Sequence, residues 1–258
     1  KWLLIGVSIV FLIVMLVLPL VYVIYTALRE GWKVFVSSVT DEYAVKSIFL
    51  TVKVTVITVI INSVFGIFAA WLITRFKFRG KKLISTLIDL PLTISPIIAG
   101  LIFVLTFGRQ SAIYPFLEKW GIQIIFAVPG IVLATIFVTF PFISREIIPV
   151  LTVKGTDEEE AAALMGANGF QIFTQITFPH IRWAFLYGVV LCSARAMGEF
   201  GAVSVLSGHL RGITNTMPLY IELLYQAFDF TGAFAMSAIL VVMALVILVL
   251  KNIFEKSM

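Results

Sequence analysis

The sequence predicts an all-α polytopic membrane protein in which six transmembrane helices form one membrane domain, residues 1–258. The chain is 60% hydrophobic and 13% charged, whereas soluble proteins carry about 25% charged residues. Its apolar residues gather in long blocks, and a span needs about 20 of them because lipid offers no partner to an unpaired backbone group. Basic residues concentrate in one short loop, which fixes the expected orientation.

Six apolar blocks supply the predicted spans. The first block is too long for the apolar part of a signal peptide, and no small-residue cleavage site follows it, so we interpret it as a span. The longest connection lies between the fourth and fifth blocks. In chain order the predicted spans are Leu3–Leu28, Ser47–Phe76, Leu83–Phe107, Ile122–Ile148, Ile181–Leu206 and Ala233–Leu250.

The connection after the second span is strongly basic. Residues 75–82 contain five basic residues and no acidic residue. Such short loops stay on the cytoplasmic side, which places both termini and the segment 154–180 in the cytoplasm. A nucleic-acid or lipid patch is the alternative interpretation of this run, but its position between two spans favours topology. Membrane lipid is therefore an expected partner of the chain, and nucleic acid is not.

Ionisable residues inside spans are functional candidates because charge is costly in hydrocarbon. Lys53 lies near the outer end of the second span, where its long stem can reach the interface. Asp89 lies in the third span, which Pro91 and Pro96 interrupt, and backbone groups freed at this depth must face protein or a wet cavity. Asp89 is expected either to cap the broken helix or to pair with a base.

The fifth span contains Arg195 near its midpoint and Glu199 one helical turn later, so the two charges can partly neutralise each other. Small residues surround them at intervals of four, which allows close helix packing. Two interpretations stay open: a structural ion pair at a subunit interface, or an arginine beside an anion path whose geometry Glu199 holds. The candidate path or gate residues are Arg195, Glu199, Gly198, Gly201 and Asp89.

The segment 154–180 predicts a short helix of about three turns. Thr156 and Glu159 have the spacing of a capping box, and acidic residues favour a helix N-terminus. Alanines 161–163 are strong helix formers, and Asn168-Gly169 is expected to end the helix. A second amphipathic piece is expected before Pro179. Small side chains in the first helix let another protein approach its backbone closely.

This segment resembles the cytoplasmic loop of binding-protein-dependent ABC importers, whose pattern is E-A-A, three residues, G, nine residues, then I-x-L-P. The chain matches every anchor and both spacings, and Phe178 replaces the usual leucine. The resemblance implies the type I permease fold, with this helix docked in a groove of a separate ATPase subunit. The implied coupling residues are Glu160, Ala161, Ala162, Gly166, Ile176 and Pro179.

The stretch ARAMGEFGAVSVLSGHLRG at residues 194–212 looks like the sulfate and thiosulfate branch of these permeases. Molybdate permeases share the R-A-x-G-E-F-G-A core, and spacing and charge do not separate these tetrahedral oxyanions. A channel or secondary anion transporter would also explain the spans but would leave the E-A-A helix without a role. The resemblance thus implies sulfate or thiosulfate import, with molybdate or tungstate as the alternative.

The resemblance further implies an assembly in the bacterial inner membrane. It comprises an ATPase dimer that binds ATP and Mg²⁺, a second homologous permease subunit in a heterodimer, and an extracytoplasmic sulfate-binding protein. The chain itself is not expected to be an enzyme or to hold a cofactor, since Gly80-Lys81 lacks the rest of a phosphate-binding loop. A metal site is not expected either, because Cys192 is the single cysteine and no histidine cluster accompanies it.

Overall fold

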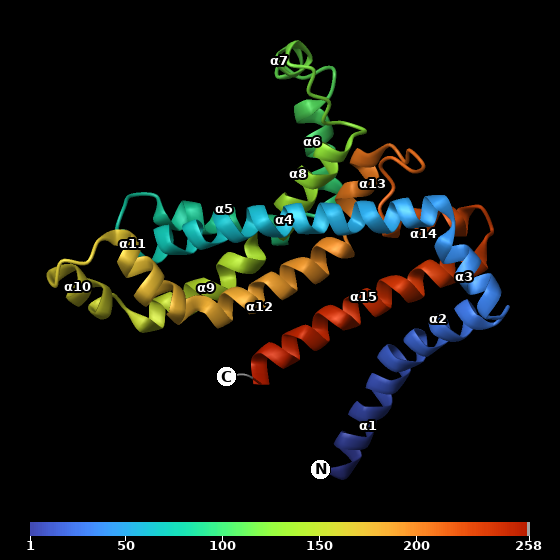
Figure 1. Cartoon of the computed structure of the whole chain (residues 1–258), viewed down its shortest axis with the longest axis horizontal. Coiled ribbons are helices and arrows are strands. Elements are labelled where there is room, and N and C mark those ends of the chain that lie inside the picture. The colour runs from blue at the N-terminus through green and yellow to red at the C-terminus, as the bar shows by residue number, and fades with distance from the viewer. Residues whose placement is uncertain (257–258) are drawn as a thin grey trace. The chain divides into compact units, whose positions relative to one another are not determined.

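The structure, a computed structural model, describes the backbone of residues 1–256 and the side chains of residues 1–250 and 252. All the regular secondary structure in this described part is helical, which confirms the predicted class (Figure 1). The chain divides into two compact units, and each is described by itself. Unit 1 combines Lys1–Thr51 with His209–Leu245, and unit 2 combines Val52–Gly208 with the residues from Val246 onward. The single membrane domain stays a prediction.

Four helices within residues 1–256 are long and apolar enough to cross a membrane, and two bent pairs of helices raise the number of candidate spans to six. All six predicted blocks overlap these segments, while the count of six stays a prediction. The four single helices are Trp2–Leu28, Glu42–Arg75, Val128–Lys154 and Phe230–Leu250. The bent pairs are Lys81–Thr93 with Pro96–Phe107, and Gly169–Met197 with Gly201–Ser207.

Unit 1 packs the start of one long helix against the C-terminal helices. Asp41 begins α4, since its carboxylate accepts the amide hydrogen of Tyr43 at 3.0 Å and the hydroxyl of Tyr220 at 3.1 Å. Ala44, Met217 and Met236 are fully buried in the core beside it. The elements are α1 (Trp2–Leu12), a π-helical stretch (Ile13–Val17), α2 (Leu18–Leu28), α3 (Trp32–Thr40), the start of α4 (Glu42–Arg75), α14 (Met217–Gln226) and most of α15 (Phe230–Lys256).

Unit 2 contains the rest of α4 and the helices that carry the candidate sites. Its core includes Ile143, Ile147 and Ile181, and α9 approaches α12 closely because a Cβ at Gly188 would lie 2.9 Å from the Cα of Ile143. The elements are α5 (Lys81–Thr93), α6 (Pro96–Phe107), α7 (Tyr114–Lys119), α8 (Val128–Thr139), α9 (Pro141–Lys154), α10 (Asp157–Leu164), α11 (Gly169–Ile172), a π-helical stretch (Phe173–Thr177), α12 (Phe178–Met197) and α13 (Gly201–Ser207).

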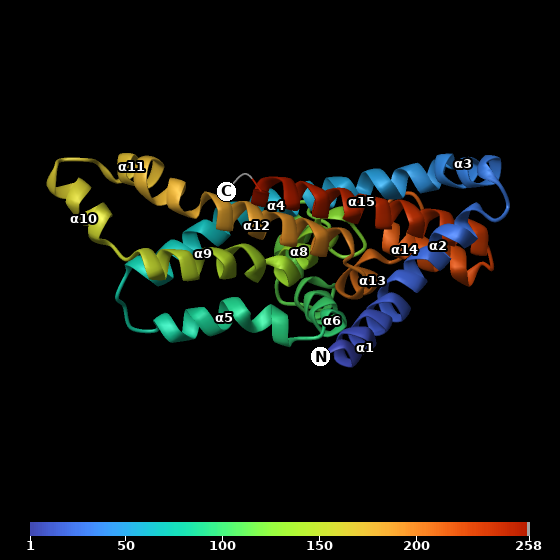
Figure 2. The ribbon, with the colours of Figure 1, turned by 90° about the horizontal axis from the view of Figure 1, so that it is seen from below.

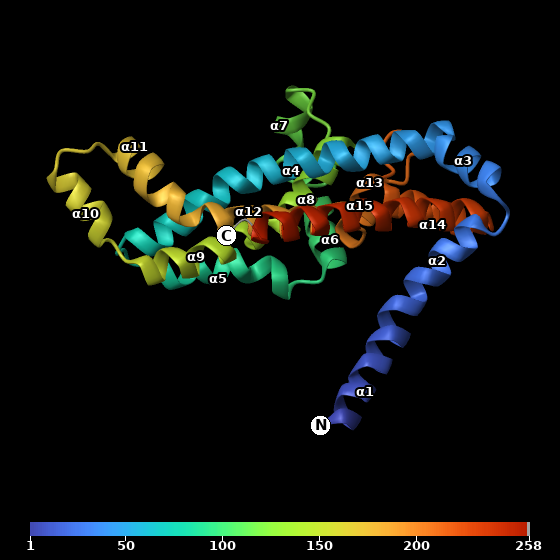
Figure 3. The same ribbon diagram turned by 60° about the horizontal axis from the view of Figure 1, so that its bottom comes forward.

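The third predicted span is broken more sharply than the sequence suggests. α5 and α6 meet at an angle of 110°, and Figure 3 shows the chain turning between them. Pro91 lies inside α5, whereas the break falls at Ile94 and Ser95, both with extended ψ angles. The residue before a proline is disfavoured in the helical region, so Pro96 ends α5 and then begins α6.

The fourth span is displaced along the sequence. Its helix runs from Val128 to Lys154 instead of from Ile122 to Ile148. Ala127 is extended and Pro129 lies in the first turn, where a proline fits a helix start. Gly155, with φ of +67°, ends the helix. Residues 122–127, apolar except for Gln123, therefore belong to the connection, because hydropathy alone does not separate a span from an apolar loop.

Candidate functional site

The predicted cytoplasmic segment projects from unit 2, with α10 and α11 extending beyond the ends of α5, α9 and α12 (Figures 1 and 2). α10 has eight residues, about two turns, so it is shorter than expected. The helix ends at Leu164, and Gly166, two residues later, has a φ of +90°. The amide of Gly166 donates to the carbonyl of Ala163 and that of Ala167 to Ala162, both at 3.0 Å, which is a Schellman motif.

The prediction that Asn168-Gly169 ends this helix is wrong. Asn168 instead begins α11, where its side chain accepts the amide hydrogen of Gln171 at 2.9 Å and its own amide donates to the Gln171 side chain. Asn is favoured at both helix ends, so residue type alone did not distinguish a stop from a start.

The predicted capping box of Thr156 and Glu159 is also wrong. The hydroxyl of Thr156 donates to the carboxylate of Glu160 at 2.7 Å, within the same segment. Glu159 turns toward the bundle, where a stronger partner is available. The sequence spacing is compatible with a Thr156–Glu159 contact, but in the folded chain Glu159 contacts a distant residue instead.

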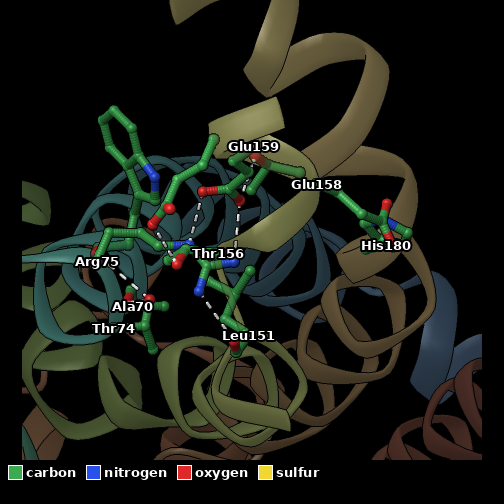
Figure 4. Close-up of polar contacts among 11 residues, drawn as sticks. Ala70, Thr74, Arg75, Leu151, Thr156, Glu158, Glu159 and His180 are labelled. Atoms are coloured by element: carbon green, nitrogen blue, oxygen red, sulfur yellow. Dashed lines mark hydrogen bonds and ion pairs between the residues drawn. The ribbon is translucent and has the colours of Figure 1, made fainter. Parts of the chain in front are cut away.

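Arg75, the last residue of α4, is that partner (Figure 4). Its Nη2 donates to Oε1 of Glu159 at 2.9 Å, and its Nε lies 2.8 Å from Oε2. Its Nη1 donates to the carbonyl oxygen of Leu151 in α9 at 3.0 Å. The hydroxyl of Thr177, just before α12, donates to Glu159 at 2.8 Å. One guanidinium thus joins the ends of α4 and α9 to α10, with side-chain exposure of 9% for Arg75 and 15% for Glu159.

Glu158 makes a second, more exposed connection. Its Oε2 lies 2.7 Å from Nε2 of His180 at the start of α12. The hydrogen bond with His180 lowers the pKa of the Glu158 carboxyl, and attraction to the same ring and to Lys154 adds to this effect. The three successive glutamates of α10 therefore have three different partners.

The motif residues lie on an open surface of this segment. Glu160 and Ala161 are exposed, Ala162 and Ile176 are half-buried, and Pro179 is exposed. Large apolar side chains accompany them, because Leu164 is 90% exposed and Met165 is 89% exposed. Such a patch on a projecting segment is typical of a protein interaction site. The coupling roles of the individual motif residues stay predictions.

The fifth predicted span breaks between α12 and α13, with a bend of 50°. Nη1 of Arg195 lies 2.7 Å from Oε2 of Glu199, whose side chain is 1% exposed, against 34% for the arginine. Oε1 of Glu199 accepts the amide hydrogen of Ala202 at 2.9 Å, in the first turn of α13. Glu199 thus connects the charge of Arg195 to the start of the next helix.

Two glycines of the break differ in packing. A Cβ added at Gly201 would lie 2.9 Å from the Cβ of Pro96, so the start of α13 abuts the start of α6. A Cβ at Gly198 would meet the carbonyl oxygen of Ala194 at 3.7 Å, an ordinary contact. Close approach therefore requires glycine at position 201 and not at 198.

Asp89 pairs with a base and does not cap the broken helix. Its Oδ1 lies 3.3 Å from Nε of Arg145, which joins α5 to α9, and both side chains are about half exposed. Sequence reasoning missed Arg145, although it falls inside the predicted fourth span and meets the same criterion as Asp89. It also missed the pairing of Arg75 with Glu159, for which no local signal exists.

Comparison with known proteins places these features in a family. The chain is 46% identical over 255 residues to the sulfate transport system permease protein CysW of Escherichia coli (strain K12), covering 99% of this chain and 88% of that protein. It is 41% identical over 257 residues to the chloroplastic sulfate permease 2 of Chlamydomonas reinhardtii, covering 100% of this chain and 70% of that protein.

A solved structure shares the fold. A chain of a bacterial alginate ABC transporter, in complex with an alginate pentasaccharide-bound periplasmic protein, has a TM-score of 0.82 at 20% identity, covering 99% of this chain and 94% of that one. The family of binding-protein-dependent transport system inner membrane components matches residues 62–258. The chain belongs to this family, as its E-A-A segment suggested.

Proposed function

We propose that the chain is the membrane-spanning permease subunit of an ABC importer for sulfate, with 154–180 as its cytoplasmic coupling segment. One observation carries this assignment: the family's E-A-A pattern lies on a projecting, Schellman-capped helix with exposed Leu164 and Met165 beside it. A rigid helix with small side chains and an apolar end fits a groove on another protein.

The topology follows from the basic loop 75–82. If each bent pair is one span, six spans place both termini and the coupling segment in the cytoplasm of the bacterial cell. Two copies of an ATPase subunit supply ATP binding and hydrolysis on that side. A second, homologous permease subunit completes the path, and an extracytoplasmic sulfate-binding protein delivers the ion.

Sulfate is favoured over molybdate because the relatives described above are sulfate permeases. In the path, Arg195 supplies positive charge near the α12–α13 break, and Glu199 fixes its position. Gly198 and Gly201 lie at this same break and Asp89 lies in the other broken pair, α5–α6, and all three are path or gate candidates. The half-exposed Asp89–Arg145 pair also fits a wet surface, since charges in spans avoid lipid.

Reconstitution of the complete complex in liposomes tests this function. We expect labelled sulfate uptake that requires ATP and the binding protein, with thiosulfate and molybdate as competitors. Uptake that persists without ATP and follows a proton gradient would instead indicate a secondary transporter. Stronger competition by molybdate than by sulfate would indicate a molybdate permease.

A pair of charge reversals tests the coupling segment. Glu160→Lys should release the ATPase from the purified complex, because it reverses charge on the proposed docking face. Glu118→Lys reverses another exposed carboxylate outside this segment, on the external side in the proposed topology, and should leave the ATPase bound. Retention of the ATPase in both variants would contradict the docking assignment.

A further inference from the structure

α10 is attached to the rest of unit 2 mainly by polar contacts. Each of its eight residues is exposed or half-buried, so apolar packing holds it weakly. A docked helix can move the bundle only through the contacts that join the two. The side chains that make those contacts therefore determine whether motion of the partner reaches the spans.

Glu159 makes the most enclosed of these contacts. Its two oxygens face the guanidinium of Arg75 at 2.9 and 2.8 Å, and Thr177 donates to it at 2.8 Å. Arg75 in turn holds the carbonyl of Leu151. A planar guanidinium fixes direction as well as distance, which a lysine ammonium does not.

The neighbouring glutamates are placed differently. Glu160 bonds to Thr156 within its own segment. Glu158 meets His180, and the Glu158 side chain is 62% exposed (Figure 4). Residues adjacent in a helix point about 100° apart, so one short run can present one carboxylate outward and another inward. We therefore place Glu160 on the face proposed to dock the ATPase, and Glu159 among the contacts that attach α10 to the rest of unit 2.

We propose that Arg75 and Glu159 form the mechanical linkage that carries movement of the coupling helix into α4 and α9, separate from the residues that dock the ATPase. This inference rests on the proposed coupling role of the segment 154–180. Arg75 and Glu159 act as positioning residues. They orient α10 relative to three helix ends without contacting nucleotide or the transported ion.

The test uses the complete complex in liposomes, with sulfate uptake and ATP hydrolysis measured together. Glu159→Gln should keep the ATPase bound while the ratio of sulfate taken up to ATP hydrolysed falls roughly 2- to 30-fold. Arg75→Lys should lower the same ratio, because a single ammonium group cannot replace the several N–H donors of the planar guanidinium. Glu158→Gln in the same helix removes only the more exposed contact with His180, so it should lower the ratio less than Glu159→Gln does.

A conformational readout separates failure of the linkage from failure of the transport assignment. In a Cys192→Ala background, Phe68→Cys on the exposed face of α4 carries an environment-sensitive fluorophore. ATP binding should change its signal in the wild-type complex, whichever ion is transported, and Glu159→Gln should reduce this change. An unchanged signal and an unchanged ratio in Glu159→Gln would overturn the linkage.

The charge-swapped variant covers the case in which single changes prevent folding. Arg75→Glu combined with Glu159→Arg restores opposite charges and should recover assembly together with part of the coupling ratio. An assembled swap variant whose ratio exceeds that of Glu159→Gln supports the linkage. An assembled swap variant with no recovery of the ratio contradicts it.

Discussion

An arginine–carboxylate pair attaches the proposed coupling segment to unit 2, and another lies at the break between α12 and α13, but the two pairs join different parts of the chain. Arg195 and Glu199 are one turn apart in sequence, and the carboxylate also holds the first turn of α13. Arg75 and Glu159 are 84 residues apart and join helix ends that share no local connection. The first pair shapes one break, whereas the second connects separate elements.

Because the two pairs join different elements, we expect different effects when each pair is removed. The Glu199 carboxylate is 1% exposed and has no water to replace its partner, so we expect loss of Arg195 to affect mainly folding and the proposed translocation path. Arg75 and Glu159 lie near the exposed end of the bundle, so their loss affects transmission more than folding. The variants below test this contrast in order of expected effect.

Arg195→Gln should have the largest effect. It leaves the buried carboxylate of Glu199 without its counter-ion, which costs about 3 to 5 kcal/mol of unfolding free energy. Glu199→Gln should cost less, because an amide oxygen still accepts the Ala202 amide hydrogen. Denaturant unfolding of the purified subunit in detergent measures both, and a larger loss in Glu199→Gln would contradict the comparison.

Gly201→Ala should give the second-largest loss of unfolding free energy, because its Cβ would meet Pro96 at 2.9 Å and force α13 away from α6. Overpacking of this kind costs about 1 to 3 kcal/mol. Gly198→Ala is the matched control, and its change should stay within about 0.5 kcal/mol. Equal losses in the two variants would show that the break is not held by this close contact.

A double-mutant cycle sharpens the contrast for Arg75→Gln and Glu159→Gln. Because the two side chains touch, we expect an interaction free energy of about 0.5 to 3 kcal/mol in unfolding measurements. The parallel cycle of Arg75→Gln with Glu160→Gln should give a value near zero, since Glu160 bonds within its own segment. A comparable interaction in both cycles would remove the distinction between the adjacent glutamates.

Glu158 should give the smallest effect, and it depends on pH. Its pKa is lower in the folded chain than the ordinary value of 4.5, so its contribution is complete above 4.5 and is lost as the pH falls through the lowered value. Thermal unfolding of wild type and Glu158→Gln as a function of pH measures this difference. A contribution that grows as the pH falls below 4.5 would contradict the assigned direction.

Much of the fold class and the position of the family's motif were predictable because both depend on local patterns. Long apolar blocks indicate helical spans, and the E-A-A spacing locates the proposed coupling segment. The capping of that segment was not predictable. Asn168 suits either helix end, and the positive φ of Gly166 follows from where α10 stops.

The sequence by itself determined that the chain is helical and membrane-spanning, and which segment carries the family's coupling motif. Only the tertiary structure decided which of Glu158, Glu159 and Glu160 turns inward, that Asp89 meets Arg145, and how sharply α5 bends into α6. The physical reason is the distance along the chain over which each signal acts. Hydropathy and residue spacing act over a few turns of one helix, whereas the partner of a charged side chain depends on which distant helix end packs beside it.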